Sequence, residues 1–187
     1  MDNDEIYARF GISSKLAYGL IVQSILVICA TIISIWGLFE LKDQIFSIRY
    51  MTNIISILTC ISLLVYSFYG FNAEKNQERF FITSVILFII LMIFGLFTSA
   101  LQFNSPVNIL GVISLISTIF FLHDYTKSYK SANFALLITL VLSVIIVIFN
   151  IMGGMPWFAA VKYIIIPFTI ALTYFERVKR GKYQFKI

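Results

Sequence analysis

The sequence predicts an all-α integral membrane protein, a single bundle of six transmembrane helices with both termini in the cytoplasm. The first observation is composition, since 60% of the residues are hydrophobic and only 12% are charged. Soluble domains carry about 25% charged residues. The second is a series of six long apolar stretches, and the third is the placement of Lys and Arg between them.

Each apolar stretch is close to the roughly 20 residues that a helix needs to cross the hydrocarbon core. None shows the alternating polarity of a membrane β-barrel strand. The spans form one transmembrane domain (16–175), between a cytoplasmic segment (1–15) and a basic cytoplasmic tail (176–187). The predicted spans are residues 16–39, 53–71, 81–101, 107–125, 133–151 and 157–175.

The cations predict the orientation, because cytoplasmic loops of membrane proteins are enriched in Lys and Arg. Lys42 and Arg49 lie on the predicted outer side, and Lys162 lies within the sixth span. We therefore expect a multi-pass protein of the cell membrane with cytoplasmic N- and C-termini. The remaining 11 of the 14 basic residues lie on the predicted inner side: Arg9, Lys15, Lys75, Arg79, Lys127, Lys130, Arg177, Lys179, Arg180, Lys182 and Lys186.

A regular spacing runs through the predicted inner connections. Lys75, Lys127 and Lys179 are each 52 residues apart, and a second basic residue follows each of them. This regular spacing fits three helical-hairpin repeats, and internal repeats recur in transport folds. The alternative is that membrane topology alone imposes it.

Lys162 is the one charged residue well inside a predicted span. Helical side chains lean toward the N-terminus, which here is the outer surface, so we expect Lys162 to snorkel to water. The alternative is that Lys162 faces a cavity and binds an anionic or carbonyl-bearing ligand, since charges within the membrane mark functional sites.

Three amides join Lys162 as candidate ligand-binding residues. Gln23 lies in the first span, and Asn108 and Asn150 lie near the outer ends of the fourth and fifth. They could line a solute-binding mouth. Alternatively, Gln23 bonds to another helix, and the asparagines cap helices or meet headgroups.

The longest outer connection, residues 40–52, has helical periodicity. It predicts either a short helix on the outer membrane surface or an outward extension of the second span. As to its role, a lid over an outward-facing cavity and a solvated connector are both compatible with this pattern.

The basic tail is predicted to contact anionic headgroups of the inner leaflet. A docking peptide for a cytoplasmic partner is the alternative. The predicted headgroup contacts are Arg177, Lys179, Arg180, Lys182 and Lys186.

Catalysis, a cofactor, a metal and nucleic acid are not expected. The sequence lacks catalytic and phosphate-binding motifs, and the spans hold no Asp or Glu away from their ends. His123 and Asp124 are adjacent and so should not share a helix face, which makes a poor dyad. Cys29 and Cys60 lack metal-ligand neighbours. No basic face carries the interleaved aromatics of a nucleic-acid binder.

In size and number of predicted spans, the chain resembles the substrate-capturing subunits of energy-coupling-factor vitamin importers. Those subunits carry an Ala-x-x-x-Ala contact in the first span, and Ala17 and Ala30 do not have that spacing. Membership is therefore not indicated. The predicted function is a small-solute transport-related or membrane solute-binding subunit. The alternative is a non-catalytic accessory protein that packs against a partner membrane protein. Expected partners are the lipid bilayer and a membrane or cytoplasmic subunit.

Overall fold

The computed structural model describes residues 14–45, 47–69, 74–98, 106–155 and 157–179, and the regular structure in these segments is helical. The predicted all-helical class is confirmed there. Besides one short 3-10 turn, η1 (Lys42–Gln44), the described segments form six long helices: α2 (Ser14–Glu40), α3 (Ile48–Tyr69), α4 (Glu74–Thr98), α5 (Pro106–Lys127), α6 (Ser131–Met152) and α7 (Trp157–Lys179).

Most of these helices have the length and the apolar composition of membrane-spanning segments. In the described part of the chain, α2 to α6 are the five helices long and apolar enough to cross a membrane. Their outward faces expose large apolar side chains such as Ile32, Phe97 and Phe134. An apolar surface this extensive is typical of a protein surrounded by lipid. α7 is not among the five, and it carries Lys162, Glu176 and Arg177.

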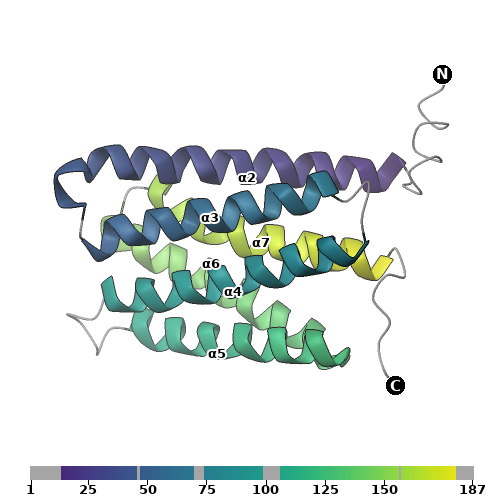
Figure 1. Ribbon diagram of the computed structural model, residues 1–187. Coiled ribbons are helices and arrows are strands. Elements are labelled where there is room, and N and C mark those ends of the chain that lie inside the picture. The colour runs from purple at the N-terminus through teal and green to yellow at the C-terminus, as the bar shows by residue number, and fades with distance from the viewer. Residues whose placement is uncertain (1–13, 46, 70–73, 99–105, 156, 180–187) are drawn as a thin grey trace.

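The helices run alternately in opposite directions, side by side (Figure 1), and the contacts between them close into a ring. Each helix packs against its neighbours in sequence, and α7 returns to pack against α2. α7 also contacts α3 and α4, so it lies toward the centre of the bundle. Among pairs of consecutive helices, α3–α4 and α5–α6 make the most extensive contacts and α4–α5 the least.

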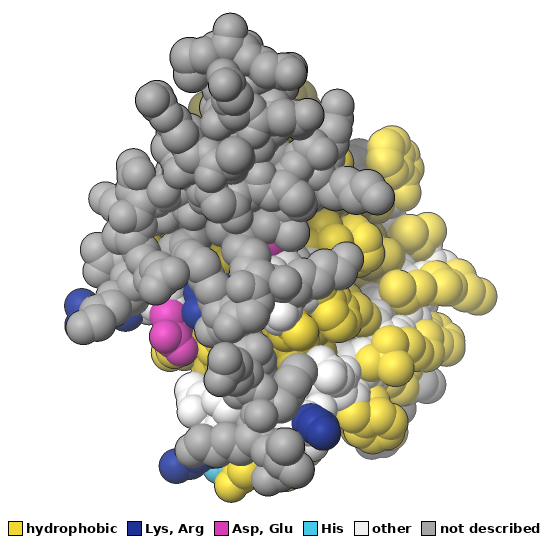
Figure 2. All heavy atoms as spheres, turned by 90° about the vertical axis from the view of Figure 1, so that its right-hand side faces the viewer, with side chains coloured by type: hydrophobic (Ala, Val, Ile, Leu, Met, Phe, Trp, Pro, Cys, Tyr) yellow, Lys and Arg dark blue, Asp and Glu magenta, His cyan; other side chains and the backbone are white. Residues whose placement is uncertain are grey.

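The two ends of the bundle differ in charge. We call the end where α2 begins and α7 finishes the basic end, since Arg79, Lys127, Lys130 and Arg177 lie there. Figure 2 looks onto this end, where Lys and Arg side chains lie on the face and hydrophobic side chains cover the flank. The opposite end, which contains η1, is the η1 end. Lys42 and Arg49 are the described Lys and Arg residues at its surface.

Hydroxyl groups join neighbouring helices inside the bundle. Ser34 and Ser56 lie 2.8 Å apart (Oγ to Oγ) between α2 and α3, and Ser84 Oγ donates to Ser62 Oγ at 3.0 Å between α3 and α4. Ser117 Oγ donates to the Ala135 carbonyl at 2.6 Å between α5 and α6. Small hydroxyl side chains let helices approach closely while satisfying polar groups that lipid cannot satisfy.

The core at the basic end is aromatic. Tyr66, Phe81, Phe121, Tyr125 and Tyr174 are buried, and neighbouring rings among them have centroids 5.0–6.4 Å apart. Two phenols also bond across the bundle. Tyr66 Oη donates to Glu176 Oε2 at 2.9 Å, and Tyr174 Oη donates to Asn133 Oδ1 at 2.7 Å. We call these five rings the aromatic cluster.

The helices extend beyond several predicted span limits. α3 begins at Ile48 instead of residue 53, and α4 begins at Glu74 instead of residue 81. Of the two arrangements predicted for residues 40–52, the extension of the second span is therefore found, since α3 begins at Ile48 and is preceded by the short η1. Hydropathy marks only the apolar part of a helix, whereas backbone hydrogen bonding continues into the polar region.

The Tyr66–Glu176 hydrogen bond yields a stability prediction. Tyr66→Phe removes a donor to a buried carboxylate, so we expect the free energy of unfolding to fall by about 1.5–3 kcal/mol. Titration with sodium dodecyl sulfate in mixed micelles would measure it. Tyr129→Phe, which alters an exposed ring, is the matched control and should have little effect. Equal stability of the two variants would contradict the role of this bond.

Candidate ligand-binding cavity

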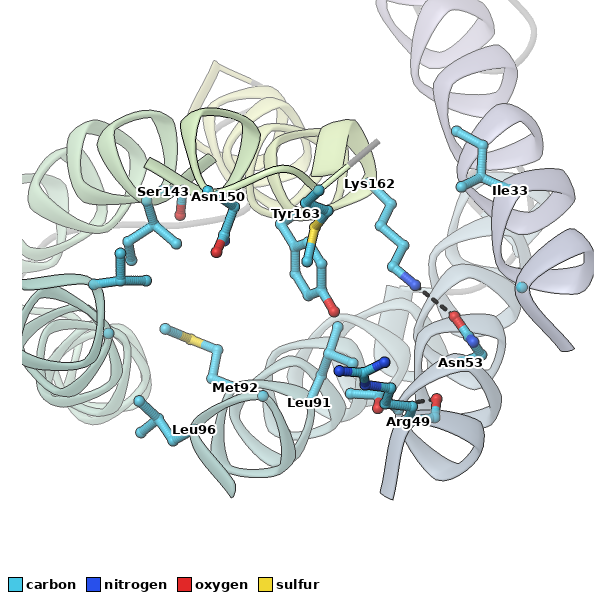
Figure 3. Close-up of a pocket in the computed structure, with 18 of the residues that line it drawn as sticks. Ile33, Arg49, Asn53, Leu91, Met92, Leu96, Ser143, Asn150, Lys162 and Tyr163 are labelled. Carbon is cyan, nitrogen blue, oxygen red and sulfur yellow. Dashed lines mark hydrogen bonds between the residues drawn. The ribbon is translucent and has the colours of Figure 1, made fainter. Parts of the chain in front are cut away.

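A cavity of about 640 Å³ lies at the η1 end, with walls contributed by every long helix of the described segments (Figure 3). Its volume is within the range of roughly 300–1,000 Å³ that is typical of small-molecule sites. It reaches the surface at the exposed residues Glu40, Arg49 and Gly154. One lining residue from each of α2 to α7, in order, is Gly37, Asn53, Leu91, Asn108, Asn150 and Lys162.

Lys162 is the most unusual residue of the wall. Its ammonium group donates a hydrogen bond to Asn53 Oδ1, and the two side chains are only 7% and 5% exposed. Figure 3 shows Lys162 extending from α7 toward Asn53 on α3. The expectation that Lys162 snorkels to the surface is therefore wrong, and the alternative, a lysine in a cavity wall, is the arrangement found. The reason is that α7 lies toward the centre of the ring, where this helix face meets α3.

Gly37 makes room for Asn53. A Cβ atom at Gly37 would lie 2.7 Å from Asn53 Nδ2 and 3.0 Å from Asn53 Oδ1, which is too close for any real side chain. A side chain at residue 37 would therefore force the Asn53 amide to shift from its present position beside α2. This contact holds Asn53 where its oxygen accepts the bond from Lys162.

The charged side chains that line the cavity are Glu40, Arg49 and Lys162. Trp36 Nε1 donates to Glu40 Oε1 at 2.8 Å, so this carboxylate already has a donor at the cavity rim. Lys162, in contrast, is held by a neutral amide. With two cations and one carboxylate, the cavity has a net positive lining, which favours a ligand that carries negative charge.

The rest of the wall combines amide and hydroxyl groups with apolar surface. Asn150, Ser143 and Tyr163 provide polar groups from α6 and α7, and Figure 3 shows them around the same hollow as Met92 and Leu91. A few polar groups within a mostly apolar wall are typical of sites that bind organic ligands.

Three of the four predicted ligand-binding residues meet in this cavity. Asn108, Asn150 and Lys162 line it. Gln23 does not, since it lies on α2 toward the basic end, well before Ile33, the first α2 residue of the wall. Its side chain is 1% exposed and packed inside the bundle.

Of the five predicted headgroup contacts, the structure describes the side chain of Arg177. Arg177 is 4% exposed, so it lies inside the basic end and not on a surface that lipid headgroups could reach. The side chain of Lys179 and all of Arg180, Lys182 and Lys186 lie outside the described residues. These four stay a prediction.

His123 and Asp124 are in contact although they are adjacent on the helix. His123 Nδ1 lies 3.0 Å from Asp124 Oδ1. The pair is at the end of α5, at the basic end and far from the cavity, and His123 is exposed. In the described residues, no three His, Cys, Asp or Glu side chains gather in a way that could hold a metal ion.

Arg49, Asn53 and Gly37 were not predicted as site residues. Asn53 was assigned to the border of the second span, but α3 starts at Ile48 and places Asn53 within the helix. The helical periodicity of residues 40–52 was the sequence feature that could have placed Asn53 inside a helix. The fit between Gly37 and Asn53 is a contact between two helices, and it leaves no mark in the local sequence.

Comparisons with known proteins add no assignment: no protein-family model, curated protein or solved structure matches this chain. The functional argument therefore depends on the chemistry of the cavity.

The Gly37–Asn53 contact predicts opposite effects for two glycine substitutions. Gly37→Ala should displace Asn53 and lower the free energy of unfolding by about 1–3 kcal/mol, as overpacking does. Gly95→Ala is the control, because a Cβ there meets nothing within 4 Å. It should leave stability unchanged or raise it by up to about 1 kcal/mol, through better helix propensity. Titration with sodium dodecyl sulfate would measure both, and a stable Gly37→Ala protein would refute the contact.

Proposed function

We propose that this chain is a six-span protein of the cell membrane that binds a small anionic solute in the cavity, as a solute-binding or transport-related subunit. The observation that carries this proposal is the buried Lys162, held by Asn53 in the wall of a cavity of ligand size. The cavity faces the exterior, and both termini lie in the cytoplasm.

Two features support this topology. Consecutive helices alternate in direction, so that α2 begins and α7 finishes at the same end. The described Lys and Arg residues are more numerous at that end than at the η1 surface, and cytoplasmic loops carry the excess of cations. α7 becomes the sixth span, with its less apolar face directed into the bundle.

The electrostatics of Lys162 favour an anionic ligand. A charged side chain within a membrane bundle is costly unless it is paired, and such residues pair with opposite charges, with backbone carbonyls or with a ligand. The hydrogen-bond partner of Lys162 in the described residues is the side chain of Asn53, which is neutral. A carboxylate or phosphate in the cavity would supply the missing counter-charge.

The arrangement of the core argues for a binding site that is closed on one side. The aromatic cluster fills the bundle at the basic end, and the cavity is lined from the η1 end. A ligand could therefore enter from the η1 side without a continuous pore. The accessory role is less well supported, because a protein that only packs against a partner needs no polar cavity.

Ligand binding should depend on Lys162. A thermal-shift screen of small carboxylates and phosphates on purified protein should reveal a stabilising ligand, with a gain of about 2.7 kcal/mol at 100 times its Kd. Lys162→Met should abolish that shift. Lys130→Met, a change at an exposed lysine of the basic end, should preserve it.

Two outcomes would count against this proposal. One is a broad screen in which no anion stabilises the wild-type protein. The other is a stabilising anion whose effect is the same in Lys162→Met and wild type.

The orientation is tested by cysteine labelling on intact cells. With Cys29 and Cys60 replaced by Ser, we expect a membrane-impermeant maleimide to label Lys42→Cys from outside. Lys130→Cys should react only after the cells are permeabilised. Both lysines are exposed, at opposite ends of the bundle, so they form a matched pair. The reverse pattern would overturn the orientation.

A further inference from the structure

A second hollow lies between α4 and α5, on the flank of the bundle. Its volume is about 330 Å³. Phe97 and Ile109 on its wall are 61% and 58% exposed, so it faces the surroundings of the bundle and not the core. We call it the α4–α5 groove, and its lining residues are Ile93, Leu96, Phe97, Asn108, Ile109, Val112 and Leu115.

The α4–α5 groove adjoins the main cavity. Leu96 and Asn108 line both hollows, so these two side chains form the partition between them. The partition sits in the least extensive interface between consecutive described helices. A Cβ atom at Gly111 would lie 2.8 Å from Leu96 Cδ2, so the end of the Leu96 side chain rests on a glycine of α5. A leucine side chain is flexible, and its rotation would connect the two spaces.

The two hollows differ in chemistry. The main cavity presents Lys162 and Arg49 together with amides, whereas all lining residues of the groove except Asn108 are apolar. A ligand that fills both must have an anionic end and an apolar end. If the ligand were purely polar, neither the groove nor the apolar cavity wall at Leu91 and Met92 would have a complementary partner.

We propose that the ligand is a single-chain amphiphile with an acidic head, which enters sideways from the bilayer between α4 and α5. This inference rests on the proposed function and specifies its ligand. The head lies in the cavity at Lys162, and the alkyl chain passes Leu96 into the α4–α5 groove. At roughly 30 Å³ for a water-sized group, the groove holds about ten such groups, which suits one alkyl chain.

Photo-cross-linking with a defined probe tests this inference. The full chain is placed in phosphatidylcholine nanodiscs with dodecanoate that carries a diazirine at the far end of its chain. Mass spectrometry should map cross-links to the groove residues Ile93, Phe97 and Val112, and not to the α2 face at Ile28 and Ile32. Unlabelled dodecanoate should compete, and butyrate should not.

Variants and a charge-reversed probe test the roles of Lys162, of Leu96 and of the acidic head. Lys162→Met should reduce groove labelling at least tenfold, and Lys130→Met should not change it. Leu96→Trp, which enlarges the partition, should abolish groove labelling. A trimethylammonium amphiphile with the same chain and diazirine should fail to label the groove of the wild-type protein, which tests the charge without any substitution.

The outcomes separate this inference from the proposed function. If butyrate stabilises the protein as well as dodecanoate does and the groove stays unlabelled, the ligand is a small anion, and only the amphiphile is refuted. If the groove is labelled equally in Lys162→Met or by the cationic probe, the chain is ordinary surrounding lipid, and the inference is overturned. If neither acid binds and no carboxylate or phosphate of the thermal-shift screen stabilises the protein, both proposals fail.

Discussion

Hydrocarbon cannot form hydrogen bonds, and this constraint organises the structure. Polar side chains on helices with apolar outer faces are therefore stabilised when they find partners inside the bundle. Serine pairs satisfy this need between neighbouring helices, as at Ser34–Ser56 and Ser62–Ser84. The phenol of Tyr66 meets it through Glu176, across more than a hundred residues of sequence. Each such bond fixes the rotation of two helices, so satisfying polar groups also determines which residues face the centre.

The same constraint produces two unlike halves. At the basic end, large rings fill the interior, and the hydroxyl groups of Tyr66 and Tyr174 donate hydrogen bonds within the bundle. At the η1 end, the walls carry small residues such as Gly37 and Gly111, and a hollow remains. Lys162 belongs to this half. Asn53 accepts a hydrogen bond from Lys162 but does not neutralise its charge. The uncompensated charge is the reason for proposing an anion site here.

Sequence patterns predicted where the helices lie along the chain better than which side chains meet inside the bundle. Hydropathy located the helices because each contains a long apolar stretch, and composition predicted the helical class. The side toward which Lys162 points depends on the central position of α7, which no local pattern records. Asn108 and Asn150 were recognised as polar groups near helix ends, whereas Gln23 was grouped with them although it lies in the other half. The hairpin repeat suggested by the spacing of Lys75, Lys127 and Lys179 stays a prediction.

The central claim is that polar side chains near Lys162 surround a space that water reaches from outside the cell. The most direct measurement uses Asn150→Cys in a protein free of other cysteines, treated with a small charged methanethiosulfonate in vesicles of either orientation. Our account predicts rapid modification from the exterior and none from the cytoplasmic side. Modification only from the cytoplasmic side would contradict it. So would an unreactive Asn150→Cys in vesicles where the exposed Met152→Cys reacts readily.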